Sequence, residues 1–283
     1  MSLRFKRLKA GWLPGLLLFV VGYSGGVYAD PAQDLAEFRA VYAAKFPTLA
    51  LEDFVLGTYA IDPELRAQWI ELNEFPPYEF AIDEGRALFE APFANGRTLA
   101  DCLPDRGVGF ARRLPLVEPN GRVLTLPSLI NRCRRANGAS PWESDRGPLV
   151  AVMTYLATLS RGQPLHIPLP ATVATRQVYE EGRRLFYAKR GQRNLSCADC
   201  HVAGAGRRLR EQTLAPLLGA VNHYPVYNLQ WGAMGTLHGR FAGCFEQVNA
   251  AAPQSQSRVY RALEYFLAVM SDGLPFIGPG LHR

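Results

Sequence analysis

Two cysteines and a histidine form the cluster with the clearest chemistry in this sequence. Cys197, Cys200 and His201 follow the pattern Cys-x-x-Cys-His, in which two neighbouring thiols can add to the two vinyl groups on one edge of a haem. The histidine that follows can then place its imidazole under the iron. Zinc is the alternative for a Cys-x-x-Cys pair, but it needs two further ligands in suitable places. The sequence therefore predicts one covalently attached haem c.

The ligand on the opposite side of the iron is left open by the residue types alone. Thioether, imidazole and thiolate groups all bind haem iron, and Met234 lies in the loop that must cover the haem. Met270 falls at an apolar position of an expected helix, where methionine is typical of a core. Cys244 is supported separately, by its place in an internal repeat. The other candidates of suitable type are His223 and His238.

The chain contains one module twice, in the same order and with similar spacing. Residues 85–89 (GRALF) resemble residues 182–186 (GRRLF), and residues 99–103 (LADCL) align with the motif at 197–201 (CADCH). Each copy then reaches a cysteine and an apolar stretch with helical periodicity. The segments between are irregular loops. The sequence thus predicts a mainly α fold of two tandem cytochrome c-like modules, the first of which has lost its haem.

The glycine shared by both copies calls for a packing explanation. Glycine in a helix interior is destabilising by about 1 kcal/mol relative to alanine, yet Gly182 falls within an amphipathic stretch expected to be helical. Close approach of a second helix accounts for it. We expect Tyr265 or Phe266, on the last helix, to pack over Gly182.

The first module keeps two cysteines although its haem motif is incomplete. Leucines 99 and 103 stand at the positions of the first motif cysteine and the histidine, so this copy cannot hold haem in the usual way. Cys102 and Cys133 remain, and Cys133 lies 111 residues before Cys244. If these positions face each other across a haem in the second module, they can form a disulfide in the first, provided that their Cα atoms lie within about 7 Å.

An arginine precedes the cysteine of the second module by four residues. On a helix, Arg240 and Cys244 would therefore share one face. A guanidinium group in that position lowers the pKa of a thiol and can bind an oxyanion through a forked hydrogen bond. A surface arginine and a partner for a haem propionate are equally compatible with the spacing.

The first 29 residues have the features of a secretory signal peptide. Four basic side chains precede an apolar stretch that ends in the small-residue cleavage pattern at 27–29, and the stretch is shorter than the about 20 residues of a membrane span. Without this segment, 27 basic and 25 acidic side chains remain, so the net charge falls from +6 to +2. We expect an exported chain with no stable membrane span after cleavage and no clustered basic face for nucleic acid.

These features divide the chain into five predicted segments, with a proline-rich stretch between the two modules. They are the signal peptide (1–29), an N-terminal extension without evident chemistry (30–84), the degenerate module without haem (85–162), the linker (163–171) and the haem-binding module (172–283).

Several segments of the mature chain carry a resemblance to a known family. They are residues 62–69 (DPELRAQW), 74–79 (EFPPYE) and 224–231 (YPVYNLQW), together with Arg240-Phe241 leading to Cys244. The combination of a haem motif with an Arg-Phe-x-x-Cys segment is more specific than either part. The sequence resembles the SoxA family, the catalytic cytochrome subunits of SoxAX complexes in periplasmic sulfur oxidation.

The resemblance implies a function for the chain. SoxA-type proteins join thiosulfate to a cysteine of a SoxYZ-type carrier as an S-thiosulfonate, and two electrons leave through a SoxX-type small c-type cytochrome. By matching position, His201 and Cys244 are implied as axial ligands, Cys244 as the cysteine persulfide and Arg240 as the substrate-binding residue. The missing first motif implies the one-haem type, with Cys102–Cys133 as the expected disulfide. The alternative is a plain periplasmic monohaem electron-transfer cytochrome c with His/Met ligation.

Overall fold

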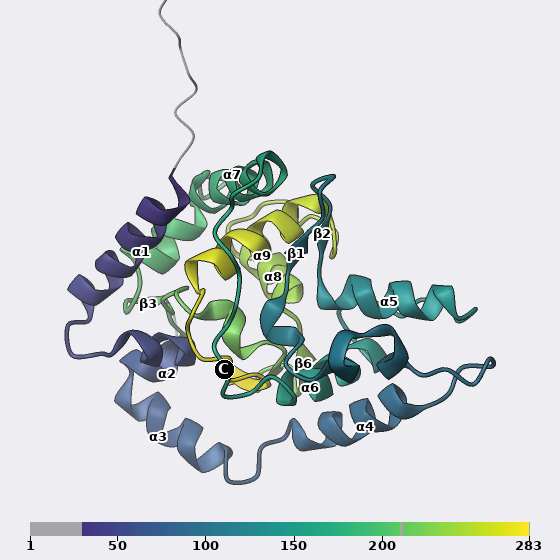
Figure 1. The fold of residues 1–283 in the computed structure, drawn as a ribbon. Coiled ribbons are helices and arrows are strands. Elements are labelled where there is room, and N and C mark those ends of the chain that lie inside the picture. Colours follow the sequence, from purple (N-terminus) through teal and green to yellow (C-terminus); the bar gives the residue numbers. More distant parts are fainter. Residues whose placement is uncertain (1–29, 210–211, 283) are drawn as a thin grey trace, which may run out of the picture.

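The computed structural model describes residues 30–209 and 212–282, so the predicted signal peptide at 1–29 lies outside the described residues. The fold is mainly helical with long irregular connections, as the sequence predicted, and it also contains three small sheets that the sequence did not predict (Figure 1). None of the helices within the described ranges is long and apolar enough to cross a membrane.

Nine α-helices form most of the regular structure of the described residues. They are α1 (Pro31–Lys45), α2 (Thr58–Ile61), α3 (Pro63–Leu72), α4 (Glu79–Glu90), α5 (Leu126–Ala136), α6 (Pro148–Thr158), α7 (Val173–Tyr187), α8 (Leu237–Gln247) and α9 (Arg258–Met270).

The strands are short. β1 (Leu116–Val117) pairs with β2 (Val123–Leu124), and β3 (Arg208–Leu209) pairs with β4 (Gln212–Thr213), both antiparallel. In the third sheet, β5 (Val226–Asn228) lies between antiparallel β6 (Ala233–Gly235) and parallel β7 (Gly280–His282).

Each module contains a helix pair that crosses at a glycine. A Cβ atom on Gly85 of α4 would lie 2.0 Å from the carbonyl oxygen of Ala151 in α6, and one on Gly182 of α7 would lie 2.1 Å from that of Ala262 in α9. The backbones can therefore approach this closely only because both residues lack a side chain. Phe266 lies over Gly182, as the sequence predicted.

The two modules face each other around an approximate twofold axis. Pro164 lies opposite Pro275 in an antiparallel bridge, although these prolines stand at equivalent positions of the repeat, 111 residues apart. Such self-pairing is the mark of an isologous contact, in which each side offers the other the same surface. The flanking backbone hydrogen bonds exchange equivalent positions in the same way, from Leu165 N to Leu274 O and from Phe276 N to Gln163 O, each 2.8 Å long.

Side chains repeat this exchange at the starts of α5 and α8. Thr125 and Thr236 cap the two helices at equivalent positions. The hydroxyl of Thr125 donates to Gln256 Oε1 in the second module, and that of Thr236 donates to Asp145 Oδ1 in the first at 2.7 Å. Asp145 and Gln256 are themselves 111 residues apart, so the two contacts are equivalent, and the bond from Thr236 anchors α8 of the second module to the first module.

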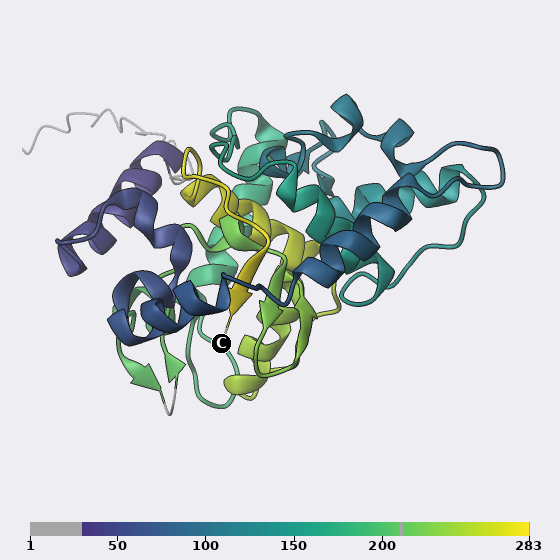
Figure 2. The ribbon, with the colours of Figure 1, turned by 90° about the horizontal axis from the view of Figure 1, so that it is seen from below.

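The N-terminal extension lies against the second module. Figures 1 and 2 both show α1, α2 and α3 on the side of α7 and α9, with α4 and α5 of the first module on the opposite side. The carboxylate of Asp34 accepts a 2.7 Å hydrogen bond from Tyr179 in α7 and forms a 2.8 Å ion pair with Arg183. The extension is therefore a cover for the module that carries the Cys-x-x-Cys-His motif.

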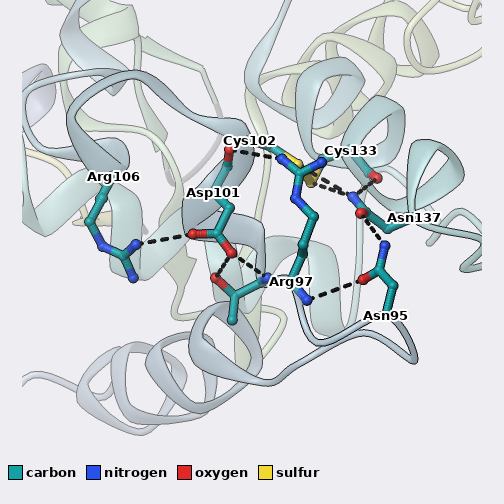
Figure 3. The surroundings of a disulfide bond; sticks show 8 residues. Asn95, Arg97, Asp101, Cys102, Arg106, Cys133 and Asn137 are labelled. Carbon is teal, nitrogen blue, oxygen red and sulfur yellow. Dashed lines mark hydrogen bonds and ion pairs between the residues drawn. A yellow bond between two sulfur atoms is a disulfide. The ribbon is translucent and has the colours of Figure 1, made fainter.

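A disulfide occupies the degenerate motif of the first module. Cys102 and Cys133 are bonded, with Cα atoms 5.8 Å apart, and Figure 3 shows Asn137 pointing toward both sulfurs. Asn137 Nδ2 also donates to the carbonyl of Cys133 at 2.9 Å. This is the pairing expected from the repeat, and the leucines at 99 and 103 are both buried in the surrounding core. Apolar side chains thus fill the place of the lost motif residues.

Candidate haem site

The second module and the N-terminal extension together line a cavity of about 570 Å³. This volume lies within the range of about 300–1,000 Å³ that is usual for ligand and cofactor sites. The predicted functional residues all line it: Cys197, Cys200, His201, Arg240 and Cys244. Aromatic and aliphatic side chains from α7, α8 and α9 make up much of the remaining wall, including Phe186, Phe241, Phe245, Leu263 and Leu267.

Cys200 and His201 of the motif lie on a single π-helical turn, Asp199–Ala203, and Cys197 precedes it. Asp199 fixes its start, because the carboxylate accepts hydrogen bonds from both the backbone N–H and the hydroxyl of Ser196 at 2.8 Å. These bonds hold the pKa of Asp199 below its usual value. Cys197 and Cys200 remain free thiols, and burial raises the pKa of both.

His201 is held in one tautomer. Its Nδ1–H donates to the carbonyl oxygen of Ala215 at 2.8 Å, which leaves Nε2 with its lone pair for a metal. Burial lowers the pKa of His201 to about 4, so the imidazole is neutral near pH 7. A backbone carbonyl behind the imidazole is the usual second partner of a metal-binding histidine, because it fixes the ring and raises its basicity.

Helix α8 brings Arg240 and Cys244 to the same cavity. The helix starts at the cap Thr236, whose side chain accepts from Gly239 N at 3.1 Å, and both residues lie one turn apart on the face toward the cavity. Burial raises the pKa of the Cys244 thiol, and the positive charge of Arg240 acts against this increase. The charge of Arg240 also reaches His201.

The other candidates for the second ligand occupy different places. Met234 lies in β6 opposite Tyr227, and Met270 and His238 are buried in helices. Among the described residues, none of these three is part of the cavity wall. His223 does line the cavity, and like His201 it donates its Nδ1–H to a backbone carbonyl, that of Val55, at 2.9 Å, which leaves its Nε2 available as well.

Two residues of the site carry no sequence signal and were not predicted. Arg190 places Nη1 3.3 Å from Cys197 Sγ and its guanidinium 4.9 Å from the ring centroid of Phe245. Tyr42, from the N-terminal extension, donates to the carbonyl of His201 at 2.8 Å. Neither residue belongs to a motif, and only the folded chain brings them to the site.

The residues present fit a covalently attached haem c. Two free thiols and a neutral imidazole with an available Nε2 line one mostly apolar cavity, and Cys244 lines it too. Thioether attachment needs the thiols, and axial ligation needs the imidazole. A structural zinc site would instead close a tetrahedron of four ligands, and the described residues contain no group of three or more histidine, cysteine or acidic residues arranged for a metal ion.

Comparison with known proteins places the chain in a family of cytochrome c domains. The family described as SoxA/TsdA, cytochrome c domain, matches residues 84–165 and 181–276. The chain belongs to the SoxA family. It is 44% identical to the L-cysteine S-thiosulfotransferase subunit SoxA of Allochromatium vinosum, over 90% of this chain and 91% of that protein. It is likewise 44% identical to the SoxA subunit of Chlorobaculum tepidum, over 88% and 87% of the two chains.

The fold is also found in a solved structure. SoxXA from P. pantotrophus matches with a TM-score of 0.70 at 24% sequence identity, covering 77% of this chain and 84% of that one. The sequence-based assignment to the SoxA family and to an enzyme family with a cytochrome c fold is thus confirmed. The two segments matched by the family coincide closely with the two copies of the internal repeat.

Proposed function

We propose that this SoxA-family chain is the haem-bearing subunit of an L-cysteine S-thiosulfotransferase that joins thiosulfate to a cysteine of a SoxYZ-like carrier protein. The observation that carries the proposal is that Cys200, His201, Arg240 and Cys244 line one cavity. The residues proposed for haem attachment, for ligation of the iron and for anion binding therefore face one cavity.

The proposed site holds one haem c. Cys197 and Cys200 would supply the thioether bonds, and His201 and Cys244 would supply the ligands of the iron. When bound, the haem provides the redox centre that takes up the electrons of the reaction. The first module contributes no second haem, because its two retained cysteines are consumed in the disulfide.

The overall reaction balances without oxygen transfer. A carrier thiol and thiosulfate form one new S–S bond, giving an S-thiosulfonate, with loss of one proton and two electrons. Arg240 binds the oxyanion end of thiosulfate through charge-assisted hydrogen bonds, and Cys244, as a persulfide, presents sulfur on the same side of α8. The electrons pass to a SoxX-like small c-type cytochrome, which we expect to form a heterodimer with this chain.

We also propose that the chain works in the periplasm, where the signal peptide predicted at 1–29 would deliver it. Covalent haem attachment and a disulfide both suit an exported protein. The segments proposed for the exported chain are the extension (30–84), the degenerate module (85–162), the linker (163–171) and the haem-binding module (172–283).

The plain electron carrier with His/Met ligation is less well supported. It requires Met234 as a ligand, but Met234 lies in β6 and is absent from the described cavity wall. Thiolate ligation also lowers the reduction potential and leaves a sulfur at the reaction centre.

A reconstituted assay tests the proposal. The haem-loaded chain, a SoxX-type cytochrome and a SoxYZ-type carrier are mixed with thiosulfate, and cytochrome reduction and carrier mass are measured. We expect Cys244→Ala to abolish turnover and to change the haem absorption spectrum. The matched control is Glu246→Gln, an exposed position on the same helix, which should leave both unchanged. Normal turnover and an unaltered spectrum in Cys244→Ala would refute the proposal.

A further inference from the structure

Three consecutive carbonyl groups of the motif turn are bound by the N-terminal extension. Tyr42 donates its hydroxyl to the carbonyl of His201 at 2.8 Å. Lys45 Nζ donates to those of Val202 at 3.0 Å and Ala203 at 2.7 Å. Tyr42 and Lys45 are three residues apart on α1 and so lie on one face of that helix. The carbonyls at the end of a helical turn lack intrahelical partners, and here α1 supplies them.

Tyr42 also contacts the segment that binds the imidazole of His201. Its hydroxyl oxygen accepts from the backbone N–H of Leu217 at 3.2 Å. Leu217 lies two residues after Ala215, whose carbonyl accepts the Nδ1–H of His201. One hydroxyl therefore ties the backbone of His201 to the segment that holds its imidazole. Tyr42 is fully buried, and burial raises the pKa of its hydroxyl, which therefore remains a donor near neutral pH.

We propose that Tyr42 is a positioning residue that fixes the orientation and the electron-donating strength of the His201 imidazole through the segment 215–217. The inference rests on the proposed haem site, in which His201 is an axial ligand. It assigns a role to the N-terminal extension, which the sequence left without chemistry.

The physical reason is the dependence of an axial imidazole on its second hydrogen bond. A short Nδ1–H···O=C bond increases the basicity of the imidazole and stabilises oxidised iron. Without the hydroxyl of Tyr42, the Leu217 amide and the His201 carbonyl lose their shared partner, so the segment 215–217 can move relative to the motif turn. The bond to Ala215 then lengthens and donation by the imidazole weakens.

The test compares two hydroxyl deletions in the haem-loaded, full-length protein. Tyr42→Phe removes the hydroxyl beside His201. Tyr179→Phe is the matched control, because Tyr179 is also fully buried and also joins α1 to the module, but its hydroxyl binds Asp34 and not the motif. The readouts are the haem reduction potential, the g-values of the oxidised haem in electron paramagnetic resonance, and the thermal unfolding midpoint.

We expect Tyr42→Phe to shift the reduction potential upward and to change the g-values, whereas Tyr179→Phe leaves both at their wild-type values. Both variants should lower the unfolding midpoint. Wild-type potential and g-values in Tyr42→Phe would overturn the inference, whatever its stability. If Tyr42→Phe fails to fold, amide hydrogen exchange in the unaltered protein decides, because rapid exchange at Leu217 would contradict the proposed bond.

The outcomes separate this inference from the proposed function. Loss of turnover in Cys244→Ala together with an unchanged potential in Tyr42→Phe would leave the transferase proposal standing and refute the role of Tyr42. A shifted potential in Tyr42→Phe together with normal turnover in Cys244→Ala would support the role of Tyr42 and refute the transferase proposal.

Discussion

At the scale of single residues, two opposing influences act on the Cys244 sulfur. Burial raises the pKa of the thiol, and the Arg240 guanidinium, one turn earlier on α8, lowers it. A second positive group, Arg190, lies beside the Cys197 sulfur at the same cavity. The cavity thus combines an apolar wall with a few cationic groups, which supports the proposal that a small dianion binds there.

The role proposed for Arg240 gives a prediction at this scale. Arg240→Gln removes a charge-assisted hydrogen bond worth about 1.5–3 kcal/mol, so we expect kcat/KM for thiosulfate to fall by about 10- to 150-fold with full haem attachment. Steady-state kinetics with the reconstituted partner proteins measure this.

Arg146→Gln is the matched control for that measurement. Arg146 is an exposed arginine paired with Glu143 at 2.9 Å and is not part of the cavity wall. If Arg240 only contacts a haem propionate, the result will instead be a change in haem content or potential with unchanged kcat/KM.

At the scale of elements, helix pairs position the cavity. α7 supplies Phe186 and α9 supplies Leu263 and Leu267 to its wall, and the two helices cross at Gly182. Aromatic contacts stabilise the crossing, since the ring centroids of Phe186 and Phe266 lie 5.3 Å apart. The crossing of these helices therefore fixes the position of one part of the cavity wall.

A glycine substitution tests this crossing. Gly182→Ala places a methyl group within 2.1 Å of the Ala262 carbonyl oxygen, which forces the helices apart, and overpacking of this kind costs about 1–3 kcal/mol. We expect a lower thermal unfolding midpoint and a loss of haem content. Gly85→Ala, at the equivalent crossing of the first module, should lower the midpoint without directly disturbing the haem site.

Gly243→Ala, in α8, is the control for replacing a helical glycine with alanine where no second helix lies close by. Gly243 lies in α8 with no atom within 4 Å of its virtual Cβ, so alanine there should raise stability by up to about 1 kcal/mol. A Gly182→Ala protein as stable as this control would show that the close crossing is not required.

The sequence predicted the parts of this architecture that repeat along the chain. The motif at 197–201, the glycine at 182 and the cysteine pair of the first module each have a counterpart in the other copy, 97 to 111 residues away, so comparison of the copies revealed them. Tyr42 and Arg190 have no such counterpart. They reach the site from distant or unpatterned segments, and periodicity carries no information about contacts that only tertiary packing creates.

The exchange of contacts between modules was also beyond sequence reasoning. Thr125 and Thr236 could be expected as helix caps, but their partners, Gln256 and Asp145, lie more than 90 residues away. Nothing in the local sequence shows that each cap also contacts the other module.

At the scale of the whole molecule, the disulfide and the proposed haem are alternative crosslinks at equivalent positions. In the first module the bond between Cys102 and Cys133 ties the degenerate motif to α5. In the second, an iron bound by both His201 and Cys244 would tie the motif turn to α8. Each module would thus have its own link between the same two elements, a disulfide in the first and the proposed iron in the second.

Removal of the disulfide tests its structural role. The bond closes a loop of 31 residues, so the double variant Cys102→Ser/Cys133→Ser should lose about 3–4 kcal/mol of unfolding free energy on the loop-entropy estimate. We expect an unchanged haem spectrum at low temperature and a lower midpoint in denaturant titration. Intact mass of the unaltered protein should show one haem and the loss of two hydrogen atoms, and a spectrum altered in the double variant would contradict the independence of the two links.

The antiparallel pairing around Pro164 and Pro275 has a consequence for the first, degenerate module. Neither module satisfies the backbone hydrogen bonds of this edge alone, because the partners of each edge lie on the corresponding edge of the other module. Deleting residues 85–165 would leave the amide of Phe276 without its acceptor and would uncover Thr236, the cap of the helix that carries Cys244. The first module is therefore required, since the geometry of the second module depends on it.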